Sequence, residues 1–346
     1  MDISKIDNNF SARCGVSSKA DIRFYNVEEE PFKVYGVRKE NGLFRRMPED
    51  VAKKVSEGVY FLHTNTAGGR VRFRTDSPYI AIRAEMSCVG KMPHFALAGS
   101  AGFDLYTDNI YVNTYVPPYS MENGYEDCID IGNGGMRDIT VNFPLYSNVK
   151  ELYIGLSESA KIEAPTPYSI DKPIVFYGSS ITQGGCASRP GTSYESIVSR
   201  YFNCNYINLG FSGNARAEDE MIDYVKSLDM SVFVLDYDHN APNEAHLRAT
   251  HEKMFNAVRR MHPSLPIVIM SRPKNLLNEW ETERLEIITQ TYKNALSRGD
   301  KNVYLLTNKE LTALCGNEGT VDNCHPTDFG FASMAQAVIS VLKNIF

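Results

Sequence analysis

Hydrophobic and polar residues alternate along much of roughly the first 160 residues of the chain. In residues 70–74, for example, Val71 and Phe73 lie between three arginines. Because successive side chains of a β-strand point to opposite faces of its sheet, this pattern predicts strands with one buried face. The pattern returns in residues 80–86, 139–143 and 152–156. We therefore expect the first half to be an antiparallel β-sandwich of the jelly-roll type.

The second half changes to short apolar runs that alternate with helical stretches. In residues 194–201 the hydrophobic positions recur every three or four residues, which indicates an amphipathic helix, and Thr192 and Glu195 predict a capping box at its start. Strands that alternate with helices predict a parallel sheet covered by helices on both faces. We expect a flavodoxin-like α/β domain with a five-stranded parallel sheet. The predicted strands are residues 174–177, 206–209, 232–235, 267–270 and 303–306.

A proline-containing stretch, residues 164–173, joins the two halves and indicates a linker. We expect residues 1–165 to form the sandwich domain and residues 171–346 to form the α/β domain. Within the first domain, residues 48–57 are predicted to form a short helix.

Charge and composition narrow the functional classes. The formal net charge is −6 and no long basic run occurs, so a nucleic-acid partner is not expected, since that affinity rests on clustered Lys and Arg. No segment approaches the roughly 20 apolar residues of a membrane-spanning helix, and the N-terminus lacks the apolar run of a signal peptide. Seven scattered cysteines, an odd number, do not suggest a disulfide framework. These features predict a cytoplasmic protein without a membrane partner.

Small and polar residues follow the predicted strands. Ser180 follows the first strand, Gly213 the second, Asn240 the third, and Asp322 and His325 come after the fifth. Because ligands bind at the carboxyl edge of open α/β sheets, we expect these residues to lie together. A hydroxyl nucleophile, a base with its carboxylate, and amide donors are what acyl transfer requires.

In order and spacing these segments resemble the sequence blocks of the SGNH (GDSL-type) hydrolases, over roughly residues 172–346. The resemblance implies that Ser180 is the nucleophile, His325 the general base and Asp322 the residue that orients the imidazole. It also implies an oxyanion hole formed by the N–H of Ser180, the N–H of Gly213 and the side-chain amide of Asn240. We expect no cofactor and no metal.

The chain departs from the family pattern at two positions. Ser179 and Ala241 stand where these hydrolases usually have aspartate. Neither position carries a catalytic role in the family, so the departures bear on the subfamily rather than on the activity.

The first half also carries a family signature. Residues 102–106 are Gly-Phe-Asp-Leu-Tyr, which matches the Gly-x-Asp-Leu-Tyr signature of a sandwich domain that precedes some SGNH esterases. The arrangement is similar to that of carbohydrate esterase family 2, whose members remove O-acetyl groups from plant polysaccharide fragments. The resemblance therefore implies an acetylesterase with an acetylated oligosaccharide, or another small ester, as substrate.

Two other functions stay open at this point. A lysophospholipase or thioesterase would carry an apolar acyl channel, and a non-catalytic glycan-binding protein would need none of the reacting residues. The oligomeric state is not predicted.

Several residues have two interpretations. Arg189 and Trp280 are candidate substrate contacts, but a structural hydrogen bond and core packing are equal alternatives. We expect Asp104 and Tyr106 of the signature to brace the sandwich or its interface.

Three histidines, His239, His246 and His251, lie close together in sequence. Their spacing does not place two imidazoles at i and i+4 on one helical face, so solvated loop and helix positions are expected instead of a metal site.

Overall fold

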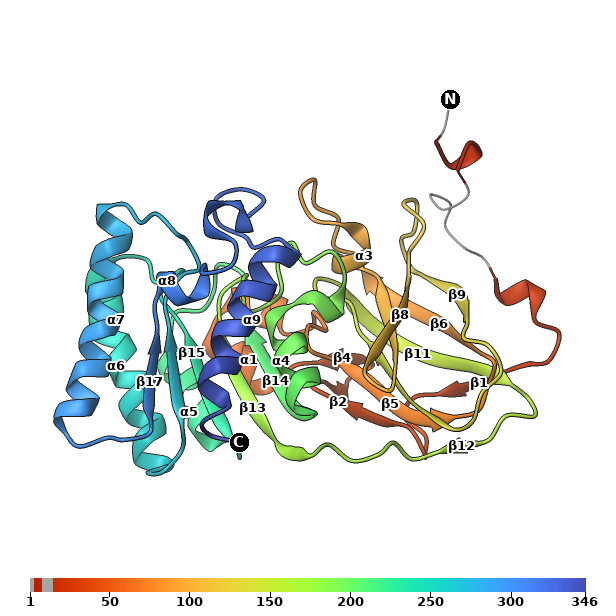
Figure 1. Cartoon of the computed structure of the whole chain (residues 1–346), viewed down its shortest axis with the longest axis horizontal. Coiled ribbons are helices and arrows are strands. Elements are labelled where there is room, and N and C mark those ends of the chain that lie inside the picture. Colours follow the sequence, from red (N-terminus) through yellow and green to blue (C-terminus); the bar gives the residue numbers. More distant parts are fainter. Residues whose placement is uncertain (1–2, 8–14) are drawn as a thin grey trace.

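The computed structural model describes residues 3–7 and 15–346 and consists of a β-sheet half and an α/β half that lie side by side (Figure 1). The predicted fold class, a sandwich followed by a flavodoxin-like domain, is confirmed. In the described ranges, no helix combines the length and the apolar character needed to cross a bilayer.

The first half contains two antiparallel sheets packed face to face. One has the strand order β1-β11-β6-β9, and the other has the order β12-β5-β10-β7-β8 with β2 paired to β5. A separate hairpin, β3–β4, adjoins them. The strands are β1 (Ile22–Asn26), β2 (Lys33–Tyr35), β3 (Arg38–Glu40), β4 (Leu43–Arg45), β5 (Arg70–Thr75), β6 (Tyr79–Cys88), β7 (Phe103–Thr107), β8 (Ile110–Tyr115), β9 (Gly124–Asp130), β10 (Arg137–Asn142), β11 (Asn148–Ser157) and β12 (Ile162–Glu163).

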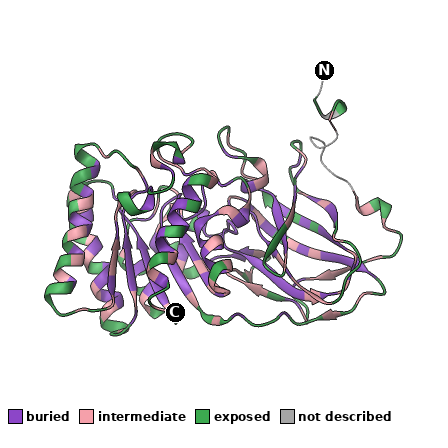
Figure 2. Ribbon diagram, in the orientation of Figure 1, coloured by how far each residue is buried: buried purple, intermediate pink, exposed green. Residues whose placement is uncertain are grey.

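The alternation along each strand decides which side chains enter the sandwich core. In β5, Val71 and Phe73 are fully buried between the sheets and pack against Ile139 and Val141 of β10. The arginines of β5 occupy the opposite face, as the period of two requires. Figure 2 shows the buried positions concentrated along both sheets.

The second half is built on a parallel sheet with the order β14-β13-β15-β16-β17. All five predicted strands are present, and the order places the first strand, β13, between the second and third, as in flavodoxin-like folds. The sheet consists of β13 (Ile170–Gly178), β14 (Cys204–Gly210), β15 (Val232–Asp236), β16 (Ile267–Met270) and β17 (Val303–Leu306).

Helices cover both faces of this sheet. Ile174 and Phe176 of β13 pack in the core beneath α4 and α9, whereas Val175 and Tyr177 pack in the core beneath α5, α6 and α7. The helices of this half are α4 (Tyr194–Phe202), α5 (Asp219–Ser227), α6 (Glu244–Met261), α7 (Glu279–Ser297), α8 (Asn308–Leu311) and α9 (Asp328–Leu342).

The predicted capping box at Thr192 is wrong. Helix α4 has Ser193 as its N-cap, one residue later than the box requires, and its cap has no side-chain hydrogen bond. Pro190–Thr192 forms a 3-10 turn ahead of the helix, and the Thr192 hydroxyl donates to the carbonyl of Arg189 at 2.9 Å. The turn therefore uses the hydroxyl that the box would need.

The helical segment of the first half belongs to the core of the second. The predicted helix at residues 48–57 is two short helices, α1 (Glu49–Val55) and α2 (Glu57–Leu62), separated at Ser56. Their buried residues pack in the same core cluster as β13, β14 and α5. The two halves thus share a hydrophobic core; the domain limits at residues 165 and 171 stay a prediction.

The Gly-x-Asp-Leu-Tyr segment joins the two halves by polar contacts. Asp104 of β7 is fully buried, and its Oδ2 accepts hydrogen bonds from Arg189 Nη1 at 2.9 Å and from the Gly191 N–H at 2.8 Å. Its Oδ1 accepts from Asn142 Nδ2 at 2.8 Å. A Cβ at position 191 would lie 2.3 Å from the Tyr106 hydroxyl, so a larger residue there would displace the Tyr106 side chain. The signature therefore fixes the loop that follows Ser180, as we expected of Asp104 and Tyr106.

This contact predicts a large loss of stability in Asp104→Ala. The substitution leaves Arg189 without its counter-charge, and breaking a buried ion pair costs about 3–5 kcal/mol. Urea unfolding would measure the loss. Asp229→Ala, which removes an exposed partner of Lys172, is the control and should change little. Equal, small effects in both variants would contradict this account of the interface.

Candidate active site

Ser180 lies in the tight turn after β13, with its side chain almost fully buried. The turn needs Gly178 at its start, because a Cβ there would lie 2.0 Å from Thr182 Oγ1. The Ser180 carbonyl accepts hydrogen bonds from the Gly185 N–H at 2.8 Å and from the Tyr146 hydroxyl at 3.1 Å. Tyr146 comes from the sandwich half, so both halves hold this turn in place.

The side chains of Ser180, His325 and Asp322 form a continuous hydrogen-bonded chain. Ser180 Oγ lies 2.9 Å from His325 Nε2, and His325 Nδ1 lies 2.7 Å from Asp322 Oδ2. The other carboxylate oxygen of Asp322 accepts from the backbone N–H of His325 at 2.7 Å and of Cys324 at 3.0 Å. The carboxylate is therefore fixed by backbone contacts and in turn orients the ring.

Electrostatics favour the charged form of Asp322. Partial burial works against its charge, but the hydrogen bonds from His325 and Cys324 outweigh this effect and hold the pKa of the carboxyl below its usual value. A charged carboxylate at Nδ1 keeps the proton on that nitrogen and leaves Nε2 free to accept one from Ser180.

Three hydrogen-bond donors lie at the ends of β13, β14 and β15. The N–H groups of Ser180 and Gly213 have no acceptor among the residues that the structure describes. Gly213 is in the left-handed region with φ of +69°. Asn240 Oδ1 accepts from the Ala215 N–H at 3.3 Å, which leaves its NH₂ group as a donor. These are the three donors that the sequence predicts for an oxyanion hole.

The sequence matches two family models that together cover most of the chain. Residues 171–343 match the model of the GDSL-like lipase/acylhydrolase family, and residues 22–162 match the GxDLY model, described as the N-terminus of SGNH-hydrolase-type esterases. The chain belongs to the GDSL-like lipase/acylhydrolase family. It is an esterase of the SGNH type.

Solved structures share the two-part architecture of this GDSL-like hydrolase. A protein from Bacteroides ovatus described as a GDSL-like lipase is 26% identical, with a TM-score of 0.84, and the match covers 94% of this chain and 98% of that one. The salicylyl-acyltransferase SsfX3 of a tetracycline biosynthetic pathway is 19% identical, with a TM-score of 0.78 and the same coverage. A family two carbohydrate esterase from Cellvibrio japonicus is 12% identical, with a TM-score of 0.63 and again the same coverage. No protein with a curated description matches the sequence.

The GDSL-like hydrolase brings one further histidine to this site that sequence reasoning missed. His94, from the loop between β6 and α3 (Leu97–Ser100), places Nε2 3.8 Å from Asp322 Oδ2, and its ring centroid lies 5.9 Å from that of His325. His94 precedes the Gly-x-Asp-Leu-Tyr signature by eight residues but is not part of it, and no motif of the sequence marks it.

His94 also belongs to a group of residues that could hold a metal ion. Ligand atoms of His94, Cys186 and His325 lie within 4.8 Å of one another in the described part of the chain. Burial raises the pKa of the Cys186 thiol to about 12, so the thiol is protonated at neutral pH. A metal ion bound there would compete with Ser180 for His325.

Arg189 and Trp280, the two candidate substrate contacts, pack against other protein groups. Arg189 is paired with Asp104 at the interface, and its guanidinium also lies 3.8 Å from the ring centre of Tyr111. Trp280 is 44% exposed on α7, with the guanidiniums of Arg284 and Arg272 at 3.9 and 4.8 Å from its ring. The contacts of Arg189 favour its structural interpretation. The contacts of Trp280 do not include Ser180, His325 or Asp322.

The three clustered histidines are dispersed in the fold. His246 Nε2 lies 2.8 Å from the Arg216 carbonyl, and His251, fully buried, contacts Thr291 Oγ1 through Nδ1 at 2.8 Å. Burial lowers the pKa of His239 well below its usual value. The prediction that these three histidines occupy solvated positions is wrong for His251, because α6 turns its side chain toward α7. It is also wrong for His239, whose side chain is only 9% exposed.

The buried side chain of Asp236 holds the Ser180 turn in place. Asp236, the last residue of β15, accepts hydrogen bonds from the hydroxyls of Thr182 at 2.8 Å and Tyr194 at 3.3 Å. Burial raises the pKa of its carboxyl to about 7. Thr182 lies in the Ser180 turn, so this carboxyl connects that turn to the neighbouring strand.

The raised pKa predicts a pH-dependent stability that Asp236→Asn removes. Between about pH 4 and pH 7 the folded chain holds a proton on Asp236 that the unfolded chain has released, so stability falls as pH rises through this window. The asparagine variant lacks this loss and should be the more stable of the two at pH 7.5, by at most about 4 kcal/mol. Urea unfolding of both proteins at pH 4.5 and 7.5 measures the difference. An equal pH dependence of both would show that Asp236 is ionised in the fold.

Proposed function

We propose that this chain is a serine esterase that removes O-acetyl groups from carbohydrates through an acetyl-enzyme intermediate. The observation that carries the proposal is the hydrogen-bonded chain from Ser180 Oγ through His325 to Asp322. The three groups come from turns at one edge of the sheet, where such folds bind their ligands.

The chemistry follows from this geometry. His325 Nε2 takes the proton of Ser180 as Oγ attacks the ester carbonyl, and Asp322 stabilises the imidazolium that forms. The developing oxyanion is bound by the N–H groups of Ser180 and Gly213 and by the amide of Asn240. The C–O bond to the sugar breaks, and His325 returns the proton to the sugar oxygen. Water then attacks the acetyl-enzyme by the same route and releases acetate.

The choice of an acetylated sugar rests on likeness in architecture. The family two carbohydrate esterase shares the sandwich and the hydrolase domain over nearly its whole length. The side chains of His325 and Asp322 are partly exposed, with 24% and 34% of their surface accessible. This exposure suits a bulky polar alcohol that stays partly in water. An acetylated oligosaccharide is therefore the proposed substrate, and acetate release from acetylated mannan, xylan and pectin oligosaccharides would identify the sugar.

Transfer to an alcohol acceptor is the second candidate. It is favoured by the fold shared with a salicylyl-acyltransferase, which has a higher TM-score than the carbohydrate esterase. Both reactions use the same acyl-enzyme and differ only in whether water or an alcohol attacks it. Product analysis with an added alcohol at rising concentration separates the two reactions.

The cytoplasmic location stays a prediction.

Ser180→Ala should abolish hydrolysis of p-nitrophenyl acetate, because no other group in the proposed mechanism attacks the ester. The reaction is followed by p-nitrophenol release, and circular dichroism checks the fold. Ser188→Ala, at an exposed serine of the same loop, should retain activity. Turnover by Ser180→Ala at the wild-type rate would refute the assignment. A wild-type preference for octanoate over acetate would instead favour the lysophospholipase or thioesterase alternative.

Asn240→Asp tests the oxyanion donor. Aspartate keeps the oxygen that accepts from Ala215 but removes the NH₂ group, so kcat should fall by about 10²–10³ while KM changes little. Asn240→Ala should lose as much. Steady-state kinetics on p-nitrophenyl acetate measures both constants, and a loss confined to KM would contradict the role given to Asn240.

A further inference from the structure

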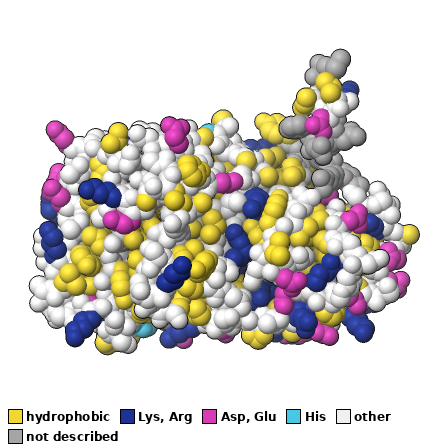
Figure 3. All heavy atoms as spheres, in the orientation of Figure 1, with side chains coloured by type: hydrophobic (Ala, Val, Ile, Leu, Met, Phe, Trp, Pro, Cys, Tyr) yellow, Lys and Arg dark blue, Asp and Glu magenta, His cyan; other side chains and the backbone are white. Residues whose placement is uncertain are grey.

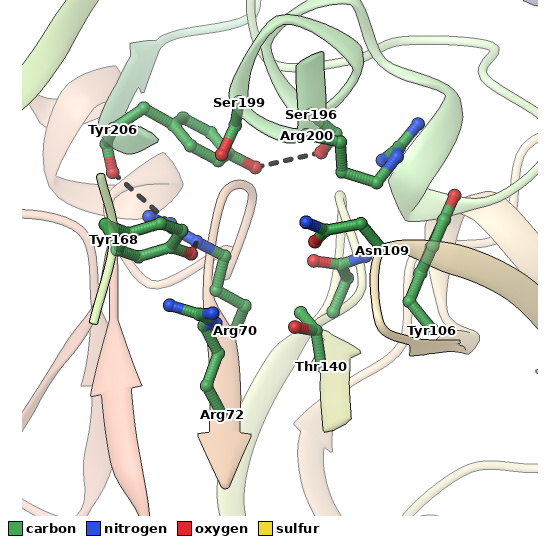
Figure 4. Close-up of a pocket in the computed structure, with 11 residues that line it drawn as sticks. Arg70, Arg72, Tyr106, Asn109, Thr140, Tyr168, Ser196, Ser199, Arg200 and Tyr206 are labelled. Carbon is green, nitrogen blue, oxygen red and sulfur yellow. Dashed lines mark hydrogen bonds between the residues drawn. The ribbon is translucent and has the colours of Figure 1, made fainter. Parts of the chain in front are cut away.

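A small cavity of about 20 Å³ lies between the sandwich and helix α4, and its lining includes none of Ser180, His325 and Asp322 (Figure 4). In Figure 4, Arg70 and Arg72 of β5 form one side, Asn109 and Thr140 lie opposite, and α4 closes the cavity with Ser196, Ser199 and Arg200. Three arginines thus line one cavity, and Figure 3 shows Lys and Arg side chains along the boundary between the two halves on the visible face.

No carboxylate balances these arginines. The lining contains neither aspartate nor glutamate, and no ion pair joins Arg70, Arg72 or Arg200 to an acidic residue in the described ranges. The nearest acid in the signature segment, Asp104, already uses both oxygens for Arg189, Gly191 and Asn142. The cavity is therefore a local excess of positive charge in a protein whose net charge is −6.

The three arginines differ in how far their donors are used. Arg70 donates to neutral oxygens only: the Tyr168 hydroxyl at 2.6 Å, the Gly68 carbonyl at 2.8 Å and Asn205 Oδ1 at 2.6 Å. Its charge is therefore solvated by the protein.

Arg72, unlike Arg70, has a buried donor that makes no hydrogen bond to the described residues. It is 4% exposed, its guanidinium lies 4.0 Å from the ring centre of Tyr168, and its Nη1 is buried without a hydrogen-bond partner among the described residues. A buried cation with an unused donor is costly unless a counter-charge or water is present. Arg200, half-buried, lies 4.4 Å from the ring centre of Tyr106 and completes the positive lining.

We propose that this cavity binds a small inorganic anion, of the size of chloride, between the sandwich and the hydrolase domain. Guanidinium, amide and hydroxyl donors of Arg72, Arg200, Asn109 and Thr140 would surround the anion, and charged donors such as guanidinium make the stronger hydrogen bonds to anions. Arg72 belongs to β5, Asn109 to the turn before β8, Thr140 to β10 and Arg200 to α4. The bound anion would therefore contact both halves.

The test measures anion-dependent stability of the full chain. The thermal midpoint is recorded in sodium gluconate at constant ionic strength while gluconate is replaced by chloride in one series and by phosphate in another. A bound anion stabilises the folded state by mass action, so the chloride series should give a saturable rise of roughly 2–4 °C. Saturation in phosphate at a lower concentration than in chloride would contradict a chloride-sized site.

Arg72→Met should remove the saturable rise, because methionine fills the apolar space of the stem without a donor. Arg74→Met is the matched control: Arg74 lies two residues further along the same face of β5, outside the cavity, and is paired with Glu163 at 3.0 Å. It should keep the rise. If Arg72→Met does not fold, Arg200→Met replaces it in the same measurement.

A crystal soaked in bromide gives an independent readout. An anomalous peak within contact distance of Arg72 would support the proposal. A rise of the midpoint that is unsaturable, or that is the same in Arg72→Met and wild type, would overturn it, as would a cavity that holds water only.

Discussion

Two turns that are 145 residues apart in sequence meet where the Ser180 hydroxyl contacts His325 Nε2 at 2.9 Å. A hydrogen bond of this length tolerates little displacement of either turn. The parallel sheet supplies the necessary rigidity, because β13 is flanked on both sides by hydrogen-bonded neighbours, and the turn after it is held by Asp236 from β15 and Tyr146 from the sandwich. These supports keep the two turns at the distance that this one contact requires.

The sandwich is part of the same support. Helices α1 and α2 complete the hydrophobic core on one side of the parallel sheet, Asp104 fixes the loop at Gly191, and His94 lies beside Asp322. The first half thus contributes buried area, polar anchoring and one titratable group to the second. This explains in physical terms why the Gly-x-Asp-Leu-Tyr signature accompanies the hydrolase: Asp104 and Tyr106 contact the loop that leaves Ser180.

Much of the fold could be predicted from the sequence, because it depends on local periodicity. Buried parallel strands are short apolar runs, and all five predicted strands are present; the carboxyl edge of the sheet then brings Ser180 and His325 together by topology. The start of α4 could not be predicted, because Thr192 has two local partners and only the packed loop selects the Arg189 carbonyl. The position of His94 and the burial of Arg72 depend on the docking of two halves, for which a single sequence carries no pattern. Arg189 also shows this limit, since its partner Asp104 is 85 residues away.

The most direct test of the account is to locate the acyl group during turnover. The full chain is mixed with p-nitrophenyl acetate, quenched in acid within the first turnover, digested and analysed by mass spectrometry. One acetyl group is expected on the peptide that carries Ser180, attached to its oxygen, and none after complete turnover. An acetyl group on Cys186 or His325 instead, or full turnover without acetylation of Ser180, would contradict this expectation.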